Sequence, residues 1–114
     1  MQPPYIWRWR RGRVGRLPKP RFIWYAPPKV TFIPVDSSGN PVPSNEVIEL
    51  YPDELEALRL VYLEKLTQEE AAKRMGISRG TLWRLLDSGR RKVVRALVEV
   101  KPISIVVQPK QTST

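Results

Sequence analysis

Arginine and tryptophan side chains cluster just after Ser78, and their types suit the recognition of a polyanion. Arg79, Trp83 and Arg84 fall within one short stretch, so a helix would bring them to one side of its surface. A guanidinium group binds phosphate or guanine through two parallel hydrogen bonds, and an indole stacks on bases. These residue types therefore predict contacts to nucleic acid.

Groups that could support catalysis or bind a metal are scarce. The chain has no Cys and no His, which excludes disulfides, zinc clusters and the common pairs of nucleophile and base. Glu54, Glu56, Glu69 and Glu70 could be considered for a catalytic site, but their places on predicted helices are typical of solvated or capping residues. We therefore expect no enzyme activity, no cofactor and no metal.

Charge is unevenly distributed along the 114 residues, which carry a net charge of +9. Residues 1–29 hold eight cations and no acid, residues 30–70 hold two cations and nine acids, and residues 71–114 hold ten cations and two acids. An acidic middle between two basic ends predicts a polyanion that is contacted from two places.

The elements that must position these side chains divide the chain into four parts. We expect a basic arm rich in Trp, Arg and Pro at 1–29, short strands and a turn at 30–50, a helix-turn-helix domain at 51–101, and a short strand with a polar tail at 102–114. The predicted fold class is mainly α: a helix-turn-helix with a three-helix core, short flanking β-strands and an extended basic N-terminal arm.

The first helix is predicted over residues 52 to about 65. Pro52 suits the first helical position, and Asp53 and Glu54 suit the positive end of the helix dipole. Its apolar stripe would consist of Leu55, Leu58, Val61 and Tyr62.

Two further helices are predicted on either side of Gly76. Thr67 and Glu70 form a capping box at the start of the earlier helix, and Gly76 ends it. Ser78 caps the later helix, whose inward face would be Leu82, Leu85 and Leu86. The polar stretch DSGRRK at 87–92, with Gly89 as a weak point, follows this face. The helix then resumes to about residue 100, with a Leu/Val stripe that we expect in the core.

Three short strands are predicted around the helices. The stretch VTFIPV at 30–35 is an edge strand because it contains Pro34. The stretches EVIEL at 46–50 and ISIVV at 103–107 would be the others. An exposed edge of the last strand would allow a homodimer to form.

Residues 72–85 have the spacing of a helix-turn-helix, in which Ala72, Gly76, Leu82 and Leu85 follow the order small, turn, apolar, apolar. An ordinary helical hairpin has the same spacing, and the basic charge favours the unit that presents its second helix to the major groove. Arg79, Gly80, Trp83 and Arg84 would then face bases. The predicted nucleic-acid-binding residues of this region are Ser78, Arg79, Gly80, Thr81, Trp83, Arg84, Arg90, Arg91 and Lys92.

The stretch DELEALRLVYLEKLTQEEAAKRMGISRGTLWRLLDSGRRKVVRALVE closely resembles a family of small, largely uncharacterised predicted DNA-binding proteins of bacteria and archaea. Their helix-turn-helix is similar to region 4 of sigma factors. The resemblance covers about residues 19–105 and implies a helix-turn-helix fold and DNA binding. This chain lacks the family's N-terminal Cys residues, has Gly80 where Gln is usual and Trp83 where a small residue is usual, and adds the arm before Lys19. Gly80 removes a side chain that could read adenine.

The arm WRWRRGRVGR at 7–16 suits a segment that follows a phosphate backbone. Its predicted nucleic-acid-binding residues are Trp7, Arg8, Trp9, Arg10, Arg11, Arg13 and Arg16. A solvated basic tail and a membrane-surface segment are the alternatives. Prolines and charges predict that the arm lies outside the core, so deletion of residues 1–18 should leave the melting temperature nearly unchanged.

Two functions remain open from the sequence. The first is a DNA-binding helix-turn-helix transcriptional regulator or chromatin-associated protein, which the resemblance, Arg79 and Arg84 favour. The second is an RNA-binding accessory protein of a ribonucleoprotein such as the ribosome, which the arm and Gly80 favour. The predicted partner is nucleic acid, duplex DNA in preference to structured RNA, and not a membrane. The chain has neither a secretory signal nor an apolar run long enough to span a bilayer, so we expect a cytoplasmic protein.

Overall fold

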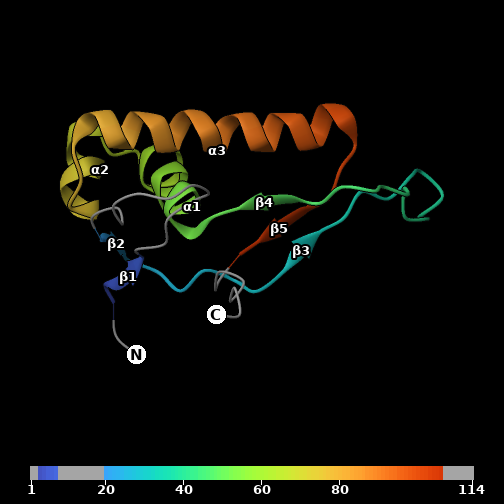
Figure 1. Cartoon of the computed structure of the whole chain (residues 1–114), viewed down its shortest axis with the longest axis horizontal. Coiled ribbons are helices and arrows are strands. Elements are labelled where there is room, and N and C mark those ends of the chain that lie inside the picture. Colours follow the sequence, from blue (N-terminus) through green and yellow to red (C-terminus); the bar gives the residue numbers. More distant parts are fainter. Residues whose placement is uncertain (1–2, 8–19, 107–114) are drawn as a thin grey trace, which may run out of the picture.

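A computed structural model describes residues 3–7 and 20–106 of the chain. The strands are β1 (Tyr5–Trp7), β2 (Arg21–Ile23), β3 (Thr31–Phe32), β4 (Ile48–Leu50) and β5 (Ile103–Ile105). The helices are α1 (Pro52–Leu58), its π-helical continuation η1 (Arg59–Leu63), α2 (Gln68–Met75) and α3 (Arg79–Glu99). Figure 1 shows α3 running along one side of the molecule, over α1 and α2 at one end and over the strands at the other. The predicted three helices with short strands are therefore present.

The larger sheet has the strand order β3-β5-β4, with β4 parallel and β3 antiparallel to β5. The strand predicted at 30–35 is indeed at the edge of this sheet. The strand predicted at 103–107 is its central strand, with neighbours on both sides. The expectation that this strand has an exposed edge is therefore wrong, and the homodimer itself stays a prediction.

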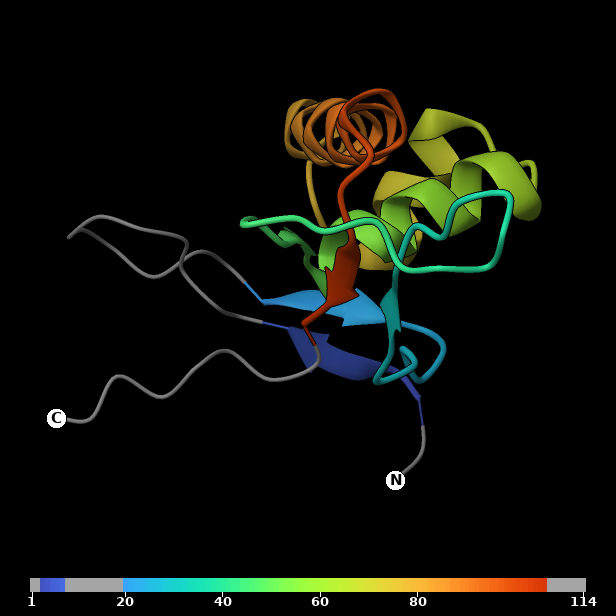
Figure 2. The ribbon, with the colours of Figure 1, turned by 90° about the vertical axis from the view of Figure 1, so that its right-hand side faces the viewer.

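β1 and β2 form a separate antiparallel pair, which the sequence did not predict. Trp7 lies opposite Arg21, and Tyr5 lies opposite Ile23. Trp7 is 8% exposed and belongs, with Ile23, to the same hydrophobic core as the helices. Figure 2 shows this pair lying below the helices. The expectation that Trp7 belongs to an arm outside the core is wrong, because strand pairing places its indole against the helices.

α1 begins at Pro52, as predicted, but its buried face differs from the predicted apolar stripe. Asp53, Glu54 and Glu56 are buried together with Ala57, whereas Tyr62 is half exposed. The helix finishes in the π-helical turn η1, and Lys65 beyond it has a left-handed φ of 59°. The expectation that Glu54 and Glu56 are solvated is wrong, because both carboxylates are buried and accept hydrogen bonds from protein groups described below.

α3 is continuous through the polar stretch at 87–92. Gly89 is buried, and a Cβ at this position would lie 3.0 Å from Cδ1 of Leu58. The missing side chain therefore lets α1 approach closely, which compensates for the low helix propensity of glycine. Leu82, Leu85 and Leu86 are buried as predicted.

The last turns of α3 are apolar and exposed, contrary to expectation. Leu97 and Val98 are each 74% exposed, and Val94 is also exposed, whereas Ala96 is buried. This half of α3 extends past α1 and α2, so only the strands lie against it (Figure 1). Within the described residues, no helix is long and apolar enough to cross a membrane.

Replacing Trp7 by alanine should destabilise the protein by about 3–5 kcal/mol, because it removes a large buried side chain and leaves a cavity. Urea denaturation followed by circular dichroism measures the change. Ile6→Ala is the matched control in the same strand, since Ile6 is 65% exposed, and it should change stability by no more than about 0.5 kcal/mol. Equal stability of the two variants would show that β1 is not part of the core.

Candidate nucleic-acid interface

α2 and α3 are joined by a turn at residues 76–78 whose geometry follows from local side-chain chemistry. Thr67 and Glu70 form the predicted capping box at the start of α2. Hydrogen bonds from the backbone and side chain of Thr67 hold the pKa of Glu70 below its usual value. Gly76 ends α2 with a φ of 69°, and the Ser78 hydroxyl caps α3 by accepting from the Thr81 N–H at 3.1 Å. These predicted boundaries are confirmed.

The turn is covered by the β1–β2 pair. The ring of Phe22 lies so close to Gly76 that a Cβ there would be 2.9 Å from two ring carbons. The indole Nε1 of Trp24 donates to the Arg74 carbonyl oxygen at 2.7 Å, and the Arg74 guanidinium lies 5.1 Å from the centre of the same indole. The strand pair is therefore seated on the end of α2 from which α3 departs.

Buried carboxylates connect this strand pair and α3 to α1. Glu56 accepts from the Trp24 N–H at 2.8 Å and from Arg59 at 2.8 and 3.0 Å. The hydrogen bond to Glu56 raises the pKa of Arg59. Burial raises the pKa of Tyr25, whose ring lies 4.8 Å from the Arg59 guanidinium. Glu56 therefore fixes the position of β2 relative to α1.

Glu54 performs the same role toward α3. Its carboxylate is 1% exposed and accepts from the Tyr51 N–H at 2.9 Å, from the Ser88 hydroxyl and from the Lys92 ammonium at 2.8 Å. Lys92 also lies 4.4 Å from the centre of the Tyr51 ring. Lys92 therefore binds a carboxylate and an aromatic ring within the protein, and its predicted contact to nucleic acid stays a prediction.

The remaining predicted residues of α3 are mostly on its surface. Arg79, Gly80, Trp83 and Arg84 are exposed, as are Arg90 and Arg91. Among the ion pairs of the described residues, none involves Arg79, Arg84 or Arg90. Arg84 donates to the Thr81 hydroxyl at 3.3 Å, and Arg90 donates to the Tyr62 hydroxyl at 2.8 Å. Arg91 is paired with Asp87 at 3.2 Å.

The two hydroxyl groups that we predicted to contact nucleic acid, those of Ser78 and Thr81, are hydrogen-bonded to each other. The Ser78 hydroxyl donates to the Thr81 hydroxyl at 3.0 Å and also caps the helix. Thr81 is half-buried, and Ser78 is exposed. The structure therefore brings Ser78 and Thr81 next to Arg79 and Arg84, but their hydroxyl groups already form hydrogen bonds within the first turn of α3.

The arm contributes one described residue to the predicted site, Trp7, whose ring centre is 6.3 Å from that of Tyr51. Because it is buried, it is not available to stack on a base. Arg8, Trp9, Arg10, Arg11, Arg13 and Arg16 lie outside the described residues. Their predicted contacts therefore stay predictions.

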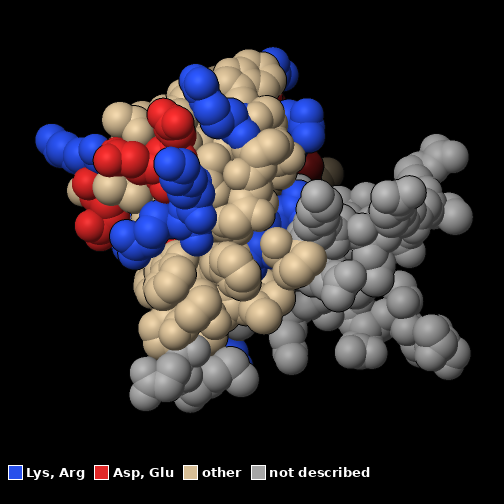
Figure 3. All heavy atoms as spheres, turned by 90° about the vertical axis from the view of Figure 1, so that its left-hand side faces the viewer, with Lys and Arg blue, Asp and Glu red and all other residues tan. Residues whose placement is uncertain are grey.

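Figure 3 shows the end of the molecule at which α2 and α3 meet. Lys and Arg side chains project at its top and on both sides, a group of carboxylates lies among those on the left, and the lower part is mostly formed by other residues. Sequence reasoning missed two exposed cations here, Lys73 and Arg74 of α2. The signal that could have identified them is their position in the last turn of a helix, where cations favour the negative end of the dipole.

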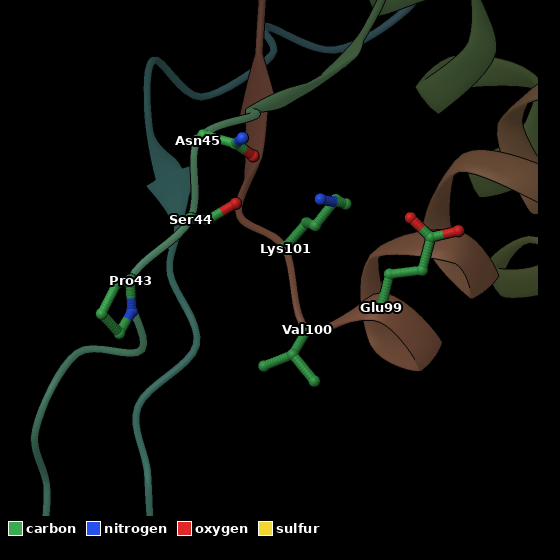
Figure 4. Close-up of a pocket in the computed structure, with 6 residues that line it drawn as sticks. All are labelled: Pro43, Ser44, Asn45, Glu99, Val100 and Lys101. Carbon is green, nitrogen blue, oxygen red and sulfur yellow. The ribbon is translucent and has the colours of Figure 1, made fainter.

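Two surface hollows add little to this interface. One, of about 520 Å³, is lined by Phe22, Trp24, Leu66, Glu70, Lys73 and Arg74. The other, of about 490 Å³, lies at the far end of α3, where Lys101 stands between Ser44 and Asn45 on one side and Glu99 on the other (Figure 4). Its Lys101 is already paired with Glu46 at 3.4 Å, so its lining offers little free charge to a ligand.

Comparison with known proteins places the chain in a family. Residues 9–111 match the family described as "Protein of unknown function DUF134", and the chain belongs to it. The match includes most of the basic segment that we had treated as an addition to the family. The chain is 48% identical to a UPF0251 protein of Pyrococcus furiosus over 89% of each chain. It is 46% identical to one of Methanosarcina acetivorans over 80% of this chain and 79% of that protein. No solved structure matches it significantly.

Gly76→Ala should destabilise the protein more than Gly39→Ala. Both glycines have positive φ, which costs an alanine about 1–2 kcal/mol. Only at Gly76 would the new methyl group also meet a ring, that of Phe22, whereas the space at Gly39 is open. Thermal melting of both variants gives the comparison. Equal destabilisation would mean that the strand pair does not press on the turn.

Proposed function

We propose that this member of the DUF134 family is a DNA-binding protein that inserts the first turns of α3 into the major groove. In this proposal α2, the turn and α3 form a helix-turn-helix unit. The observation that carries the proposal is the exposed row of Arg79, Trp83 and Arg84, in which neither arginine has a carboxylate partner among the described residues.

The contrast with those described cations that pair with carboxylates supports the choice of this surface. Arg21 pairs with Asp53 at 3.3 Å, Lys92 pairs with Glu54, and Arg95 pairs with Glu46 at 2.7 Å. Carboxylates are therefore available to neutralise cations elsewhere, while the start of α3 is left positively charged. An uncompensated cationic surface attracts a polyanion over a distance of about a Debye length, roughly 8–10 Å.

The length of α3 suits insertion by its N-terminal end. Its 21 residues correspond to about 31 Å of helix, and the major groove is about 12 Å wide. Only the first turns can therefore lie in the groove, which is the part of α3 that carries Arg79, Trp83 and Arg84. Glu69 and Glu70 are exposed at the start of α2, so we expect phosphates to approach α3 and not that end of α2.

The proposed role is that of a transcriptional regulator or chromatin-associated protein of the cytoplasm. RNA binding within a ribonucleoprotein is the alternative outcome of the experiments below. A helix-turn-helix unit reads a duplex with a wide major groove, whereas that groove of an RNA helix is too narrow for side chains to read. A titration with duplex DNA and with structured RNA therefore distinguishes the two, and a preference for RNA would contradict the proposal.

The double change Arg79→Ala and Arg84→Ala should weaken binding to duplex DNA. If each guanidinium contacts a guanine, each loss costs about 1–3 kcal/mol and relaxes base preference. Fluorescence anisotropy with a labelled duplex measures the affinity, and circular dichroism confirms folding. The control is Arg95→Ala with Lys101→Ala, which removes the same charge from residues already paired with Glu46. Equal losses in both variants would show that only net charge matters.

The basic segment should contribute to affinity without contributing to sequence preference. Because Trp7 is needed in the core, the test replaces Arg8, Arg10, Arg11, Arg13 and Arg16 by serine instead of deleting the segment. The slope of log affinity against log salt should flatten by up to about 0.9 for each phosphate contact that is lost. Base preference should persist, since phosphate contacts carry no sequence information. An unchanged slope would show that these arginines do not contact the phosphate backbone of the nucleic acid.

A further inference from the structure

Trp83 is the most unusual side chain on the exposed row of α3. Its indole is 53% exposed, although tryptophan usually buries most of its large apolar surface in a core. Its exposure therefore leaves an apolar surface in the middle of a cationic one.

Gly80 lies one turn before Trp83 on the same exposed helix surface, and it has no side chain to cover that surface. A Cβ at Gly80 would have only the Ser78 hydroxyl oxygen within 4 Å, at 4.0 Å. The absence of a side chain here is thus not required by packing within the protein. The space above Gly80 is therefore open, and another molecule can approach the helix backbone there.

Arg79 and Arg84 lie on either side of Gly80 and Trp83 on the helix surface. Arg79 precedes Trp83 by one turn, and Arg84 follows Gly80 by one turn, so that the four residues form neighbouring pairs on the helix surface. We call Arg79, Gly80, Trp83 and Arg84 the Trp83 notch. It combines the apolar indole of Trp83, the uncovered backbone at Gly80 and two guanidinium groups. This combination fits a ligand that has a small apolar group within an anionic framework.

The major groove of DNA offers such a group. Thymine carries a C5 methyl group there, and it is the apolar feature by which the groove of an A·T pair is distinguished. We propose that the Trp83 notch reads the C5 methyl group of thymine, with Trp83 packed against the methyl group and Gly80 giving room for the base edge. This inference rests on the proposed function, because it requires α3 to enter the major groove.

With the Trp83 notch, the protein would discriminate between base pairs without a glutamine at position 80. A glutamine would read adenine by hydrogen bonds, whereas the notch reads its thymine partner by contact. Uracil lacks the methyl group, so the proposal also predicts discrimination between thymine and uracil in otherwise identical duplexes.

The experiment first selects preferred sites for the full-length protein from a pool of random-sequence DNA duplexes. Each thymine of one selected duplex is then replaced singly by deoxyuridine, and affinity is measured by fluorescence anisotropy. For the wild-type protein, at least one replacement should weaken binding about fourfold, the value expected for one buried methyl group. Trp83→Ala should bind the thymine and deoxyuridine duplexes equally well.

Val98→Ala is the matched control, since it also shortens an exposed apolar side chain of α3, at the other end of the helix. It should keep the wild-type discrimination, and circular dichroism should show both variants folded. Binding to the duplexes without any effect of deoxyuridine, or with the same effect in Trp83→Ala, would overturn the inference alone. Failure to bind any duplex would overturn the proposed function and, with it, this inference.

Discussion

The buried carboxylate of Glu54 decides which face of α3 reaches the surface. A buried charge is tolerated only when hydrogen bonds and an opposite charge replace its hydration. Two of its partners, Ser88 and Lys92, lie one turn apart on α3, so the helix must turn this side toward α1. Trp83 precedes Lys92 by nine residues, which is two and a half turns, and it therefore points away from the protein. Trp83 faces solvent because Glu54 holds the opposite side of the helix.

The β1–β2 pair adds a second constraint, on the turn before α3. Phe22 packs on Gly76, while Trp24 is hydrogen-bonded both to the end of α2 and, through Glu56, to α1. Contacts between residues that lie more than thirty positions apart in the chain thus hold the direction in which α3 leaves the turn. Trp7 of β1 belongs to the same core as the helices, and removal of β1 would disturb the helix that we propose as the reading element.

The acidic residues in the middle of the chain form ion pairs with the basic ends in the folded protein, which the order of charges along the sequence does not show. Asp53, Glu54 and Glu46 pair with Arg21, Lys92 and Arg95, which come from the two basic ends. Part of the block pattern is therefore cancelled within the fold. The charge that remains uncompensated at the start of α3 is a smaller and more specific surface than the composition indicates, and this makes it a better candidate for recognition.

Local chemistry determined the helix boundaries from the sequence alone. Thr67 with Glu70, Gly76 and Ser78 act within one turn of their own position, and Leu82, Leu85 and Leu86 follow the helix period, so their roles can be read from neighbouring residues. Tertiary structure alone decided that Glu54 and Trp7 are buried and that Leu97 and Val98 are exposed. Those outcomes depend on partners brought together from distant segments, or on the absence of an element to cover the end of α3. Hydropathy describes what a side chain prefers, whereas burial depends on whether the fold supplies a neighbour.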